Sequence, residues 1–334
     1  AQAIFGSRLA QAAPENKNPF AIFAASVRLC PCVIVFMDIG EPLLGIHALP
    51  PELANGVCNS GDTLAKYLEP GSKLIWHVRH GQSTGNVAKE VAWAADKGTG
   101  RRDHEEKYKA QTTYIDAPLT DLGLRQAENA RRLVVDWREK PSLVVCSPLT
   151  RAIQTAALVF QDVLCEGSAQ MVIRPELREF FPDNNENMGR TLDELRSCLA
   201  LQALPQWTNV QRALSAEAAA DWQDQWNTWW ARGDDGAWQD HVGDASRLER
   251  FRLWLSQQRE TRIAVVSHWG TINNVLNREP WAEQLERCEV PAVWGPEFWP
   301  KGGLAQKFKM PNCGWVAVTM TPAAHREVDA YAVS

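Results

Sequence analysis

The stretch "KLIWHVRHGQSTGN", residues 73–86, decides the fold of this chain. Residues 73–79 form a short, largely apolar run, which predicts a buried strand. The run ends in Arg79, His80 and Gly81, and small hydrogen-bonding side chains follow. His and Arg at a strand end are common surface features, but the exit of a buried strand is also where binding loops begin. The meaning of this exit therefore depends on what the other strand ends carry.

The composition indicates a folded, globular protein. Of the 334 residues, 45% are hydrophobic and 22% are charged, which is not a disordered composition. The formal net charge of -5 argues against broad electrostatic binding to nucleic acid or to an anionic membrane. The eight cysteines contain no C-x-x-C pair. We therefore expect reduced, mostly structural thiols and a cytoplasmic location.

Residues 1–70 are expected to form an N-terminal extension without a functional site. Its apolar run is interrupted by Arg28 and Pro31. Because a spanning helix needs roughly 20 mostly apolar residues, stable membrane insertion is not expected. We interpret the extension as partly disordered, and as either a targeting sequence or an over-extended reading of the gene whose natural start is Met37. Organelle targeting by residues 1–40 stays open.

From residue 73 onward, short β-rich runs alternate with longer helical periods, which is typical of an α/β fold with a mostly parallel sheet. Strands are predicted at 73–79, 142–147, 169–177, 262–270 and 314–320. Helices are predicted at 84–96, from Thr120 or Asp121 to 139, at 148–164 with Ser147 as cap, and at 245–258, with a charged loop at 97–117. The expected fold class is a three-layer α/β/α sandwich formed by residues 71–325.

The stretch 200–243, inside a segment at about 181–245, does not follow this alternation. It is rich in Ala, Gln and Trp, and four tryptophans stand at i, i+4, i+7 and i+8: Trp222, Trp226, Trp229 and Trp230. This spacing predicts a helix with one aromatic face. We interpret the segment as a helical, Trp-rich cap insertion near the mouth of a site, and packing onto the sheet domain is favoured over direct contact with a ligand.

Polar groups stand at four predicted strand ends. The first strand ends in Arg79 and His80, the second leads to Arg151, the third leads to Glu179, and the fourth ends in His268. Ligands of open α/β sheets bind outside the carboxyl ends of the strands. Each group alone is more typical of a surface or a cap. Together, two guanidiniums, two imidazoles and helix N-termini predict a site for a phosphoryl group.

Four motifs carry a resemblance to a known family. The stretches "VRHGQSTGN", "CSPLTRAIQTA", "LREF" and "VVSHWG" together resemble the histidine phosphatase superfamily, of the phosphoglycerate mutase-like, branch 1 type. The superfamily includes cofactor-dependent phosphoglycerate mutases and the bisphosphatase half of fructose-2,6-bisphosphate metabolism. Arg-His-Gly alone is a weak match, but the order of the motifs over residues 73–320 is highly specific.

The resemblance implies a role for each matching residue. His80 would be the nucleophile that becomes a phosphohistidine, and Arg79, Arg151 and His268 would hold the phosphoryl oxygens. Glu179 would protonate the leaving alkoxide and then activate water. Further substrate contacts are expected from the loop that follows the first strand, at Gly81, Thr84 and Asn86. Neither a metal nor a cofactor is expected, because the arginines supply the charge.

Other carboxylates compete with Glu179 for the role of proton donor. Asp183 and Glu186 follow it closely, and Asp116 lies in a loop that is expected to border the site. Such loop carboxylates are more often solvated than catalytic. Arg101 and Arg102 are candidates for a second anionic group of the substrate, although a solvated charge run is the favoured interpretation.

The expected activity is metal-independent hydrolysis of a phosphomonoester, acting on a small phosphorylated metabolite, by a histidine acid phosphatase of phosphoglycerate mutase-like type. Two alternatives stay open: a phosphoglycerate mutase-type phosphotransferase, and a non-catalytic relative that binds a phosphorylated ligand. Gln82 stands where the mutases have Glu, and "DAPLTDLGLRQAENA" is similar to the phosphatase branches. The shared core residues leave the substrate and the oligomeric state open, and the complete set favours an enzyme.

Overall fold

The computed structural model describes part of the chain. The described residues are 73–137, 139–179, 185–215, 217–219, 245–276, 310 and 312–320. The chain divides into two compact units, Ala1–Cys30 and Pro31–Ser334, and all described residues belong to the second. The predicted extension at 1–70, Asp183 and the four tryptophans of the predicted cap insertion lie outside the described residues.

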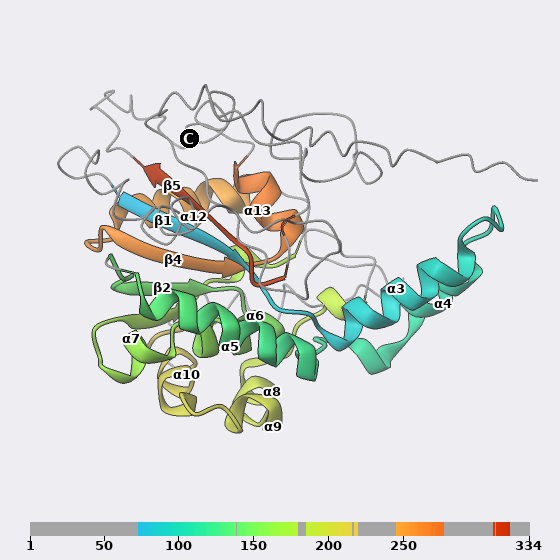
Figure 1. Cartoon of the computed structure of the whole chain (residues 1–334), viewed down its shortest axis with the longest axis horizontal. Helices are drawn as coiled ribbons and strands as arrows, with labels where there is room; N and C mark the ends of the chain where they lie inside the picture. The colour runs from blue at the N-terminus through green and yellow to red at the C-terminus, as the bar shows by residue number, and fades with distance from the viewer. Residues whose placement is uncertain are drawn as a thin grey trace, which may run out of the picture. The chain divides into compact units, whose positions relative to one another are not determined.

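A five-stranded sheet forms the centre of the described residues, with the strand order β3-β2-β4-β1-β5. The strands are β1 (Lys73–Arg79), β2 (Leu143–Cys146), β3 (Gln170–Ile173), β4 (Arg262–Ser267) and β5 (Trp315–Met320). Neighbours among β3, β2, β4 and β1 pair in parallel, whereas β5 runs antiparallel to β1 at the edge (Figure 1). The mostly parallel sheet predicted from the sequence is therefore confirmed.

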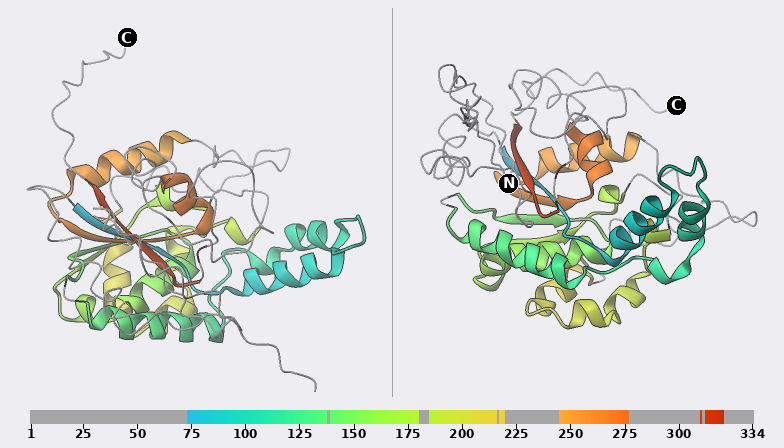
Figure 2. Two further views of the ribbon diagram at one scale, coloured as in Figure 1. Left: turned by 45° about the horizontal axis from the view of Figure 1, so that its top comes forward. Right: turned by 45° about the vertical axis from the view of Figure 1, so that its right-hand side comes forward.

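Helices cover both faces of this sheet. The helices α5 (Asp121–Val135), α6 (Thr150–Val159) and α7 (Gln161–Cys165) lie on one face, and α12 (Ala245–Gln257) and α13 (Trp269–Leu276) lie on the other (Figures 1 and 2). Because successive side chains of a strand point to opposite faces, Trp76 joins the core under α5 and α6, whereas Ile75 joins the core under α12 and α13. The three-layer α/β/α sandwich is confirmed.

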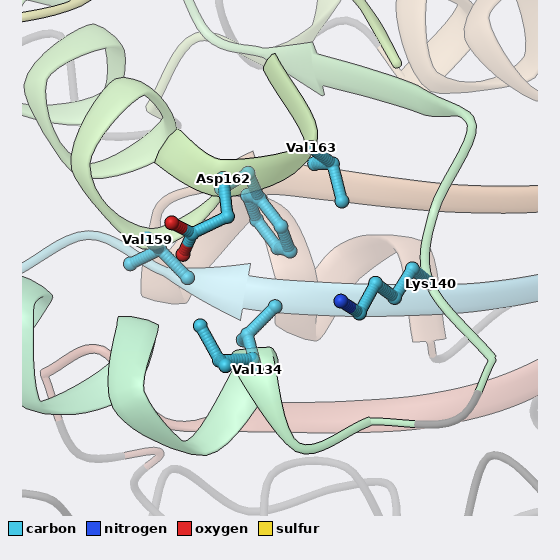
Figure 3. A pocket seen from close by; sticks show the side chains of 7 residues that line it. Val134, Lys140, Val159, Asp162 and Val163 are labelled. Atoms are coloured by element: carbon cyan, nitrogen blue, oxygen red, sulfur yellow. The ribbon is translucent and has the colours of Figure 1, made fainter. Parts of the chain in front are cut away.

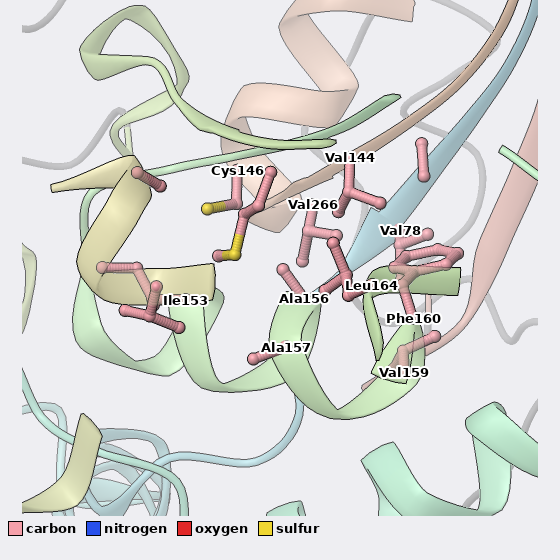
Figure 4. Close-up of a cluster of buried hydrophobic side chains, with 14 of the residues drawn as sticks. Val78, Val144, Cys146, Ile153, Ala156, Ala157, Val159, Phe160, Leu164 and Val266 are labelled. Carbon is pink, nitrogen blue, oxygen red and sulfur yellow. The ribbon is translucent and has the colours of Figure 1, made fainter. Parts of the chain in front are cut away.

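The larger core lies between the sheet and α6. Figure 4 shows Val78, Val144, Val266 and Ile153 together there, with Phe160 at the end of the helix. The aromatic part of this core also contains Trp76, Trp137 and Trp315. The Trp76 ring stacks on Trp137 at a centroid distance of 5.0 Å, and Trp137 meets the edge of Trp315 at 5.3 Å. This packing fixes β1, β2 and β4 side by side, and their carboxyl ends carry the candidate site.

The helix α3 (Thr84–Asp96) begins and ends as predicted, but α4 (Asp103–Ala110) replaces part of the predicted loop. The two helices lie side by side (Figures 1 and 2). The carboxylate of Asp96 accepts the backbone N–H groups of His104 and Glu105 at 3.2 and 2.9 Å. Because these are orphan donors of a first helical turn, Asp96 stabilises the start of α4. The 3-10 turn η2 (Thr112–Tyr114) follows.

Several predicted boundaries differ from the structure; the fourth strand, for example, ends at Ser267 rather than at 270. The third strand ends at Ile173, because Pro175 opens the 3-10 turn η3 (Pro175–Leu177). The helix α5 has the predicted cap but ends at Val135 rather than at 139. The helix α6 begins only at Thr150, and its N-cap residue is Leu149 rather than Ser147. The Ser147 side chain therefore serves another purpose.

The described part of the predicted cap insertion forms short elements. These are η4 (Asn185–Asn187), α8 (Leu192–Arg196), α9 (Leu199–Gln202) and α10 (Trp207–Ala213). The helices α9 and α10 contact α6, and α10 also contacts β3. Their buried side chains Leu201 and Val210 belong to the core under α6. Within the described residues, no helix has the length and apolar character needed to cross a membrane.

Candidate active site

His80 lies directly beyond the carboxyl end of β1, and its ring is buried. Its backbone N–H donates to the carbonyl of Ser267 at 3.0 Å, which ties the exit of β1 to β4. The ring Nδ1 lies 2.6 Å from the backbone oxygen of Gly81. Since a carbonyl oxygen only accepts, Nδ1 carries the proton and Nε2 keeps its lone pair. This is the tautomer that a nucleophilic imidazole needs.

Gly81 allows a close approach of the neighbouring chain segments. A Cβ atom at this position would lie 2.8 Å from the backbone oxygen of Gly123 and 3.2 Å from the Sγ of Cys313. The N–H of Gly81 donates to Thr155 Oγ1 at 3.0 Å. The loop after β1 is therefore held between α5, α6 and the segment before β5. The sequence predicted a substrate contact at Gly81, whereas in the structure its N–H is engaged by Thr155.

Arg151 extends from the first turn of α6 to His80, and its side chain is buried. Its Nε lies 3.3 Å from His80 Nε2, its Nη1 donates to the backbone oxygen of Glu186 at 2.6 Å, and its Nη2 donates to Asn187 Oδ1 at 2.8 Å. The guanidinium is thus fixed by two acceptors from the segment 185–187. The structure brings Arg151 to His80, as the sequence pattern predicted.

Arg79 and His268 lie on either side of the same exit. Arg79 is half-buried, and its Nη1 donates to the backbone oxygen of Met310 at 2.5 Å. Burial lowers the pKa of Arg79 to about 10, against the opposing effect of the Glu179 carboxylate, so the guanidinium stays charged at neutral pH. The His268 ring is buried, and its centroid lies 5.0 Å from that of His80 with a tilt of 57°.

Both histidines are neutral in this arrangement. Burial lowers the pKa of His80 well below its ordinary value, and the neighbouring charges of Arg151 and Arg79 lower it further. Burial and the Arg151 charge lower the pKa of His268 in the same way. A neutral His80 ring keeps the Nε2 lone pair available over a wide pH range, because no base must first remove a proton from Nε2.

Two buried glutamates lie near these groups. Glu179 Oε2 is 3.4 Å from the backbone N–H of Gly270 at the start of α13, and it interacts electrostatically with Arg79. Glu186 pairs with Lys89 at 3.3 Å, and a Cβ atom on Gly85 would lie 2.5 Å from Glu186 Oε2. The structure therefore brings Glu179 to the Arg79 side of the site and Glu186 to the α3 side.

Asp116 is fully buried, and it is not the solvated loop carboxylate that the sequence favoured. Its two oxygens accept the N–H and the hydroxyl of Thr150 at 2.7 and 2.5 Å, and one of them pairs with Arg190 Nε at 3.2 Å. Burial raises the pKa of Asp116 to about 6. The Asp116 carboxylate therefore caps the helix that carries Arg151.

The remaining residues that were predicted to contact substrate are Thr84, Asn86, Arg101 and Arg102. Asn86 forms a capping box with Ser83, in which its Oδ1 accepts the Ser83 N–H, and Thr84 is the first residue of α3. Arg101 and Arg102 have exposed side chains and instead pair with Asp103 and with the buried Glu105, both at 2.6 Å. The two arginines thus belong to a solvated charge run, as favoured from the sequence.

Hollows in the described residues include the following two. One, between the end of α5 and the start of α7, is lined by Val134, Lys140, Val159, Asp162 and Val163 and is too narrow to admit water (Figure 3). The other has a volume of about 460 Å³ and contains none of the predicted catalytic groups. It opens at the start of α6, with lining residues that include Asp116, Thr150, Arg190 and Ser197.

A known protein family matches the part of the chain that contains these site residues. The family described as the histidine phosphatase superfamily (branch 1) matches residues 75–284. The chain belongs to the histidine phosphatase superfamily. A phosphoglycerate mutase-like protein of Arabidopsis thaliana is 39% identical over 222 residues, which cover 61% of this chain and 74% of that protein.

Two further relatives have a lower sequence identity to this chain. The phosphoglycerate mutase-like protein 1 of Arabidopsis thaliana is 28% identical over 221 residues, which cover 61% of this chain and 71% of that protein. The adenosylcobalamin/alpha-ribazole phosphatase of Escherichia coli is 27% identical over 208 residues, which cover 61% of this chain and 77% of that protein. Relatives of this chain thus carry both phosphatase and mutase-like names.

Sequence reasoning missed several groups that support the site. Asn187 and the backbone of Glu186 hold Arg151, and Thr155 holds the Gly81 backbone. Thr155 could have been recognised from the sequence, because it belongs to the S-P-L-x-R-A-x-Q-T-A motif and so had a sequence signal. Asn187 had none, because its contact depends on how the segment after η3 returns to α6. Among the described residues, no group of three or more His, Cys, Asp or Glu side chains is arranged to hold a metal ion.

Proposed function

We propose that this histidine phosphatase hydrolyses small phosphomonoesters through a phosphohistidine at His80. The observation that carries the proposal is the hydrogen bond from His80 Nδ1 to the Gly81 carbonyl, which leaves Nε2 as the nucleophile. Arg151 at 3.3 Å and the charged Arg79 supply the positive charge that phosphoryl transfer needs. The proposal assigns the phosphoryl oxygens to Arg79, Arg151 and His268, with a further donor from the side-chain amide of Asn86.

The reaction takes two steps. In the first, Nε2 of His80 attacks phosphorus, the N–P bond forms, and the bond to the ester oxygen breaks. Glu179 gives its proton to the departing alkoxide. In the second, the Glu179 carboxylate takes a proton from water, the water oxygen attacks phosphorus, and the N–P bond breaks. His80 is regenerated, and inorganic phosphate leaves.

Glu179 is assigned the acid role, and Glu186 is assigned a supporting one. Glu179 lies near Arg79, whereas the Glu186 carboxylate is already paired with Lys89. The Glu186 backbone also holds Arg151. An acid that exchanges protons with substrate and water must not be committed to a lysine, and this favours Glu179.

The organic part of the substrate has a candidate location. The cavity of about 460 Å³ opens beside Thr150, the residue before Arg151, and its volume lies in the range typical of small-ligand pockets. Its mixed lining suits a small polar metabolite.

The described cysteines, Cys146, Cys165, Cys198 and Cys313, are free thiols, which supports the proposed cytoplasmic location.

The test is to trap the phosphoenzyme. The full chain is mixed with a panel of radiolabelled phosphomonoesters, quenched within milliseconds, and assayed for protein-bound label and for free phosphate. We expect acid-labile, base-stable label in the parent protein and none in His80→Ala. Turnover that persists in His80→Ala would overturn the nucleophile assignment.

A second candidate function is a phosphotransferase of the mutase type. The two Arabidopsis relatives have mutase-like names, and a mutase would use the same His80, Arg151 and His268. Hydrolysis is favoured because Gln82 binds Thr120 through both its backbone and its side chain, so that a structural contact occupies the position where the mutases have Glu.

A further inference from the structure

Ser147 follows β2, and its side chain is completely buried. Its backbone N–H donates to the Val266 carbonyl at 3.0 Å, which fixes it beside the end of β4. Its Oγ accepts the N–H of Leu149 at 3.3 Å and lies 2.7 Å from Nε2 of His268. This hydroxyl thus joins the end of β2 to the second histidine of the site.

The direction of the Ser147–His268 hydrogen bond follows from counting donors. A hydroxyl has one proton and two lone pairs. The Leu149 N–H can only donate, so it uses a lone pair. Within the described part of the chain, His268 Nε2 is the acceptor in hydrogen-bonding range of the Ser147 proton. The hydroxyl therefore donates to Nε2, and the proton of a neutral His268 ring must lie on Nδ1.

The proton on His268 Nδ1 is available for donation to a bound ligand. It is buried and has no hydrogen-bond partner among the described residues. The His80 ring lies 5.0 Å from the His268 ring, and both rings feel the charges of Arg151 and Arg79. A buried N–H needs an acceptor, and a phosphoryl group bound at His80 would provide one. With the opposite tautomer, a lone pair would face the anionic oxygens instead.

We propose that Ser147 is a positioning residue that selects the Nδ1–H tautomer of His268, so that His268 donates from Nδ1 to a phosphoryl oxygen. The donation to a phosphoryl oxygen, which is the second half of this inference, rests on the proposed function. The choice of tautomer, which is the first half, concerns the free protein alone. The two halves can therefore be tested separately.

The tautomer is measured by long-range proton–nitrogen NMR correlation on the full chain with labelled histidine. The His268 signals are assigned by their loss in His268→Gln. We expect protonated Nδ1 and unprotonated Nε2 in the parent protein, and a substantial Nε2–H population in Ser147→Ala. An Nε2–H ring in the parent, or an unchanged tautomer in Ser147→Ala, would overturn the proposal.

Ser267→Ala is the matched control. Ser267 is also a buried serine at a strand end, it directly precedes His268, and its hydroxyl has no hydrogen-bond partner among the described residues. Its replacement removes the same atom at the same depth. We expect the His268 tautomer and the turnover of Ser267→Ala to match the parent. Ser147→Thr, which keeps a hydroxyl, should restore the parent tautomer.

The donor role is tested with vanadate, which mimics the phosphoryl group during transfer. Loss of one charge-assisted hydrogen bond predicts that vanadate binds Ser147→Ala about 10- to 100-fold more weakly, with a similar loss in kcat/KM. A changed tautomer with unchanged vanadate affinity would refute the donor role. If the parent neither binds vanadate nor forms a phosphoenzyme, the proposed function fails and the donor role with it, while NMR still decides the tautomer.

Discussion

Arg151 Nε lies 3.3 Å from Nε2 of His80, so the nitrogen that we propose as the nucleophile and the guanidinium would face the same phosphoryl group. The other nitrogens of Arg151 are held by Glu186 and Asn187. Two acceptors therefore hold the guanidinium in place, and in the proposed reaction it would face the developing charge without reorganising. Preorganised charge of this kind is usually the largest contribution to transition-state stabilisation.

Arg151→Lys should be costly although it keeps the charge. A lysine presents a single ammonium group and cannot contact His80, Glu186 and Asn187 in the fixed geometry of the fork. We expect kcat/KM to fall by roughly 30-fold or more, which corresponds to about 2 kcal/mol. The control is Arg131→Lys. Arg131 lies away from the site and binds both oxygens of Asp162, each at 3.0 Å. Equal kinetics of the two variants would remove Arg151 from the reaction.

Glu179→Gln and Glu186→Gln should affect different substrates. An acid that protonates the leaving group matters most when that group is a poor one. We therefore expect Glu179→Gln to slow hydrolysis of an alkyl phosphate far more than that of p-nitrophenyl phosphate. Glu186→Gln should affect both substrates equally, because the Glu186 carboxylate pairs with Lys89 and the backbone oxygen that holds Arg151 is unchanged. Steady-state rates on the two substrates measure this, and a selective loss in Glu186→Gln would transfer the acid role.

The free energy of unfolding should depend on pH through the titration of Asp116. Burial raises its folded pKa to about 6, above an unfolded value of about 3.9. The folded state then binds the extra proton between these values, so the contribution of Asp116 to stability falls as pH rises from about 4 to about 6. Relative to Asp116→Asn, the parent should lose about 3 kcal/mol of unfolding free energy over this range.

Urea denaturation of the parent and Asp116→Asn at pH 4, 5, 6 and 7 measures this difference. Above pH 6 the difference should stay constant. A difference that instead grows as the pH rises would mean that Arg190, at 3.2 Å, lowers the pKa of Asp116 more than burial raises it. Either result bears on α6, since Asp116 caps the helix that carries Arg151.

The meeting of His80, Arg151 and His268 could be predicted from the sequence because parallel strands put their carboxyl ends at one edge. Each residue follows a recognisable strand, and the strands are neighbours in the sheet. The supports of these groups could not be predicted in the same way. Asn187 reaches Arg151 only after the chain has left η3, and Asp116 reaches Thr150 from a loop that follows two helices.

The helix α4 shows the same limit on a local scale. Its sequence, "DHEEKYKA", is polar nearly throughout, so no apolar periodicity marks it. What stabilises its start is the Asp96 carboxylate from the end of α3. The Ser147 cap was wrong for a related reason: the serine faces His268, a residue 121 positions away. Local patterns thus locate elements well, whereas contacts between distant segments decide how polar side chains are used.

Phosphatase and mutase differ in what reaches the phosphohistidine. A mutase must exclude water while the substrate reorients, whereas a phosphatase only needs water at phosphorus. Gln82 accepts from Thr120 through both its backbone and its side chain, so this segment is fixed to the start of α5. We therefore expect net phosphate release from 3-phosphoglycerate, little conversion to 2-phosphoglycerate, and no dependence on 2,3-bisphosphoglycerate. Phosphorus NMR follows all three species at once, and interconversion faster than phosphate release would replace the phosphatase proposal with the mutase one while keeping the roles of His80, Arg151 and His268.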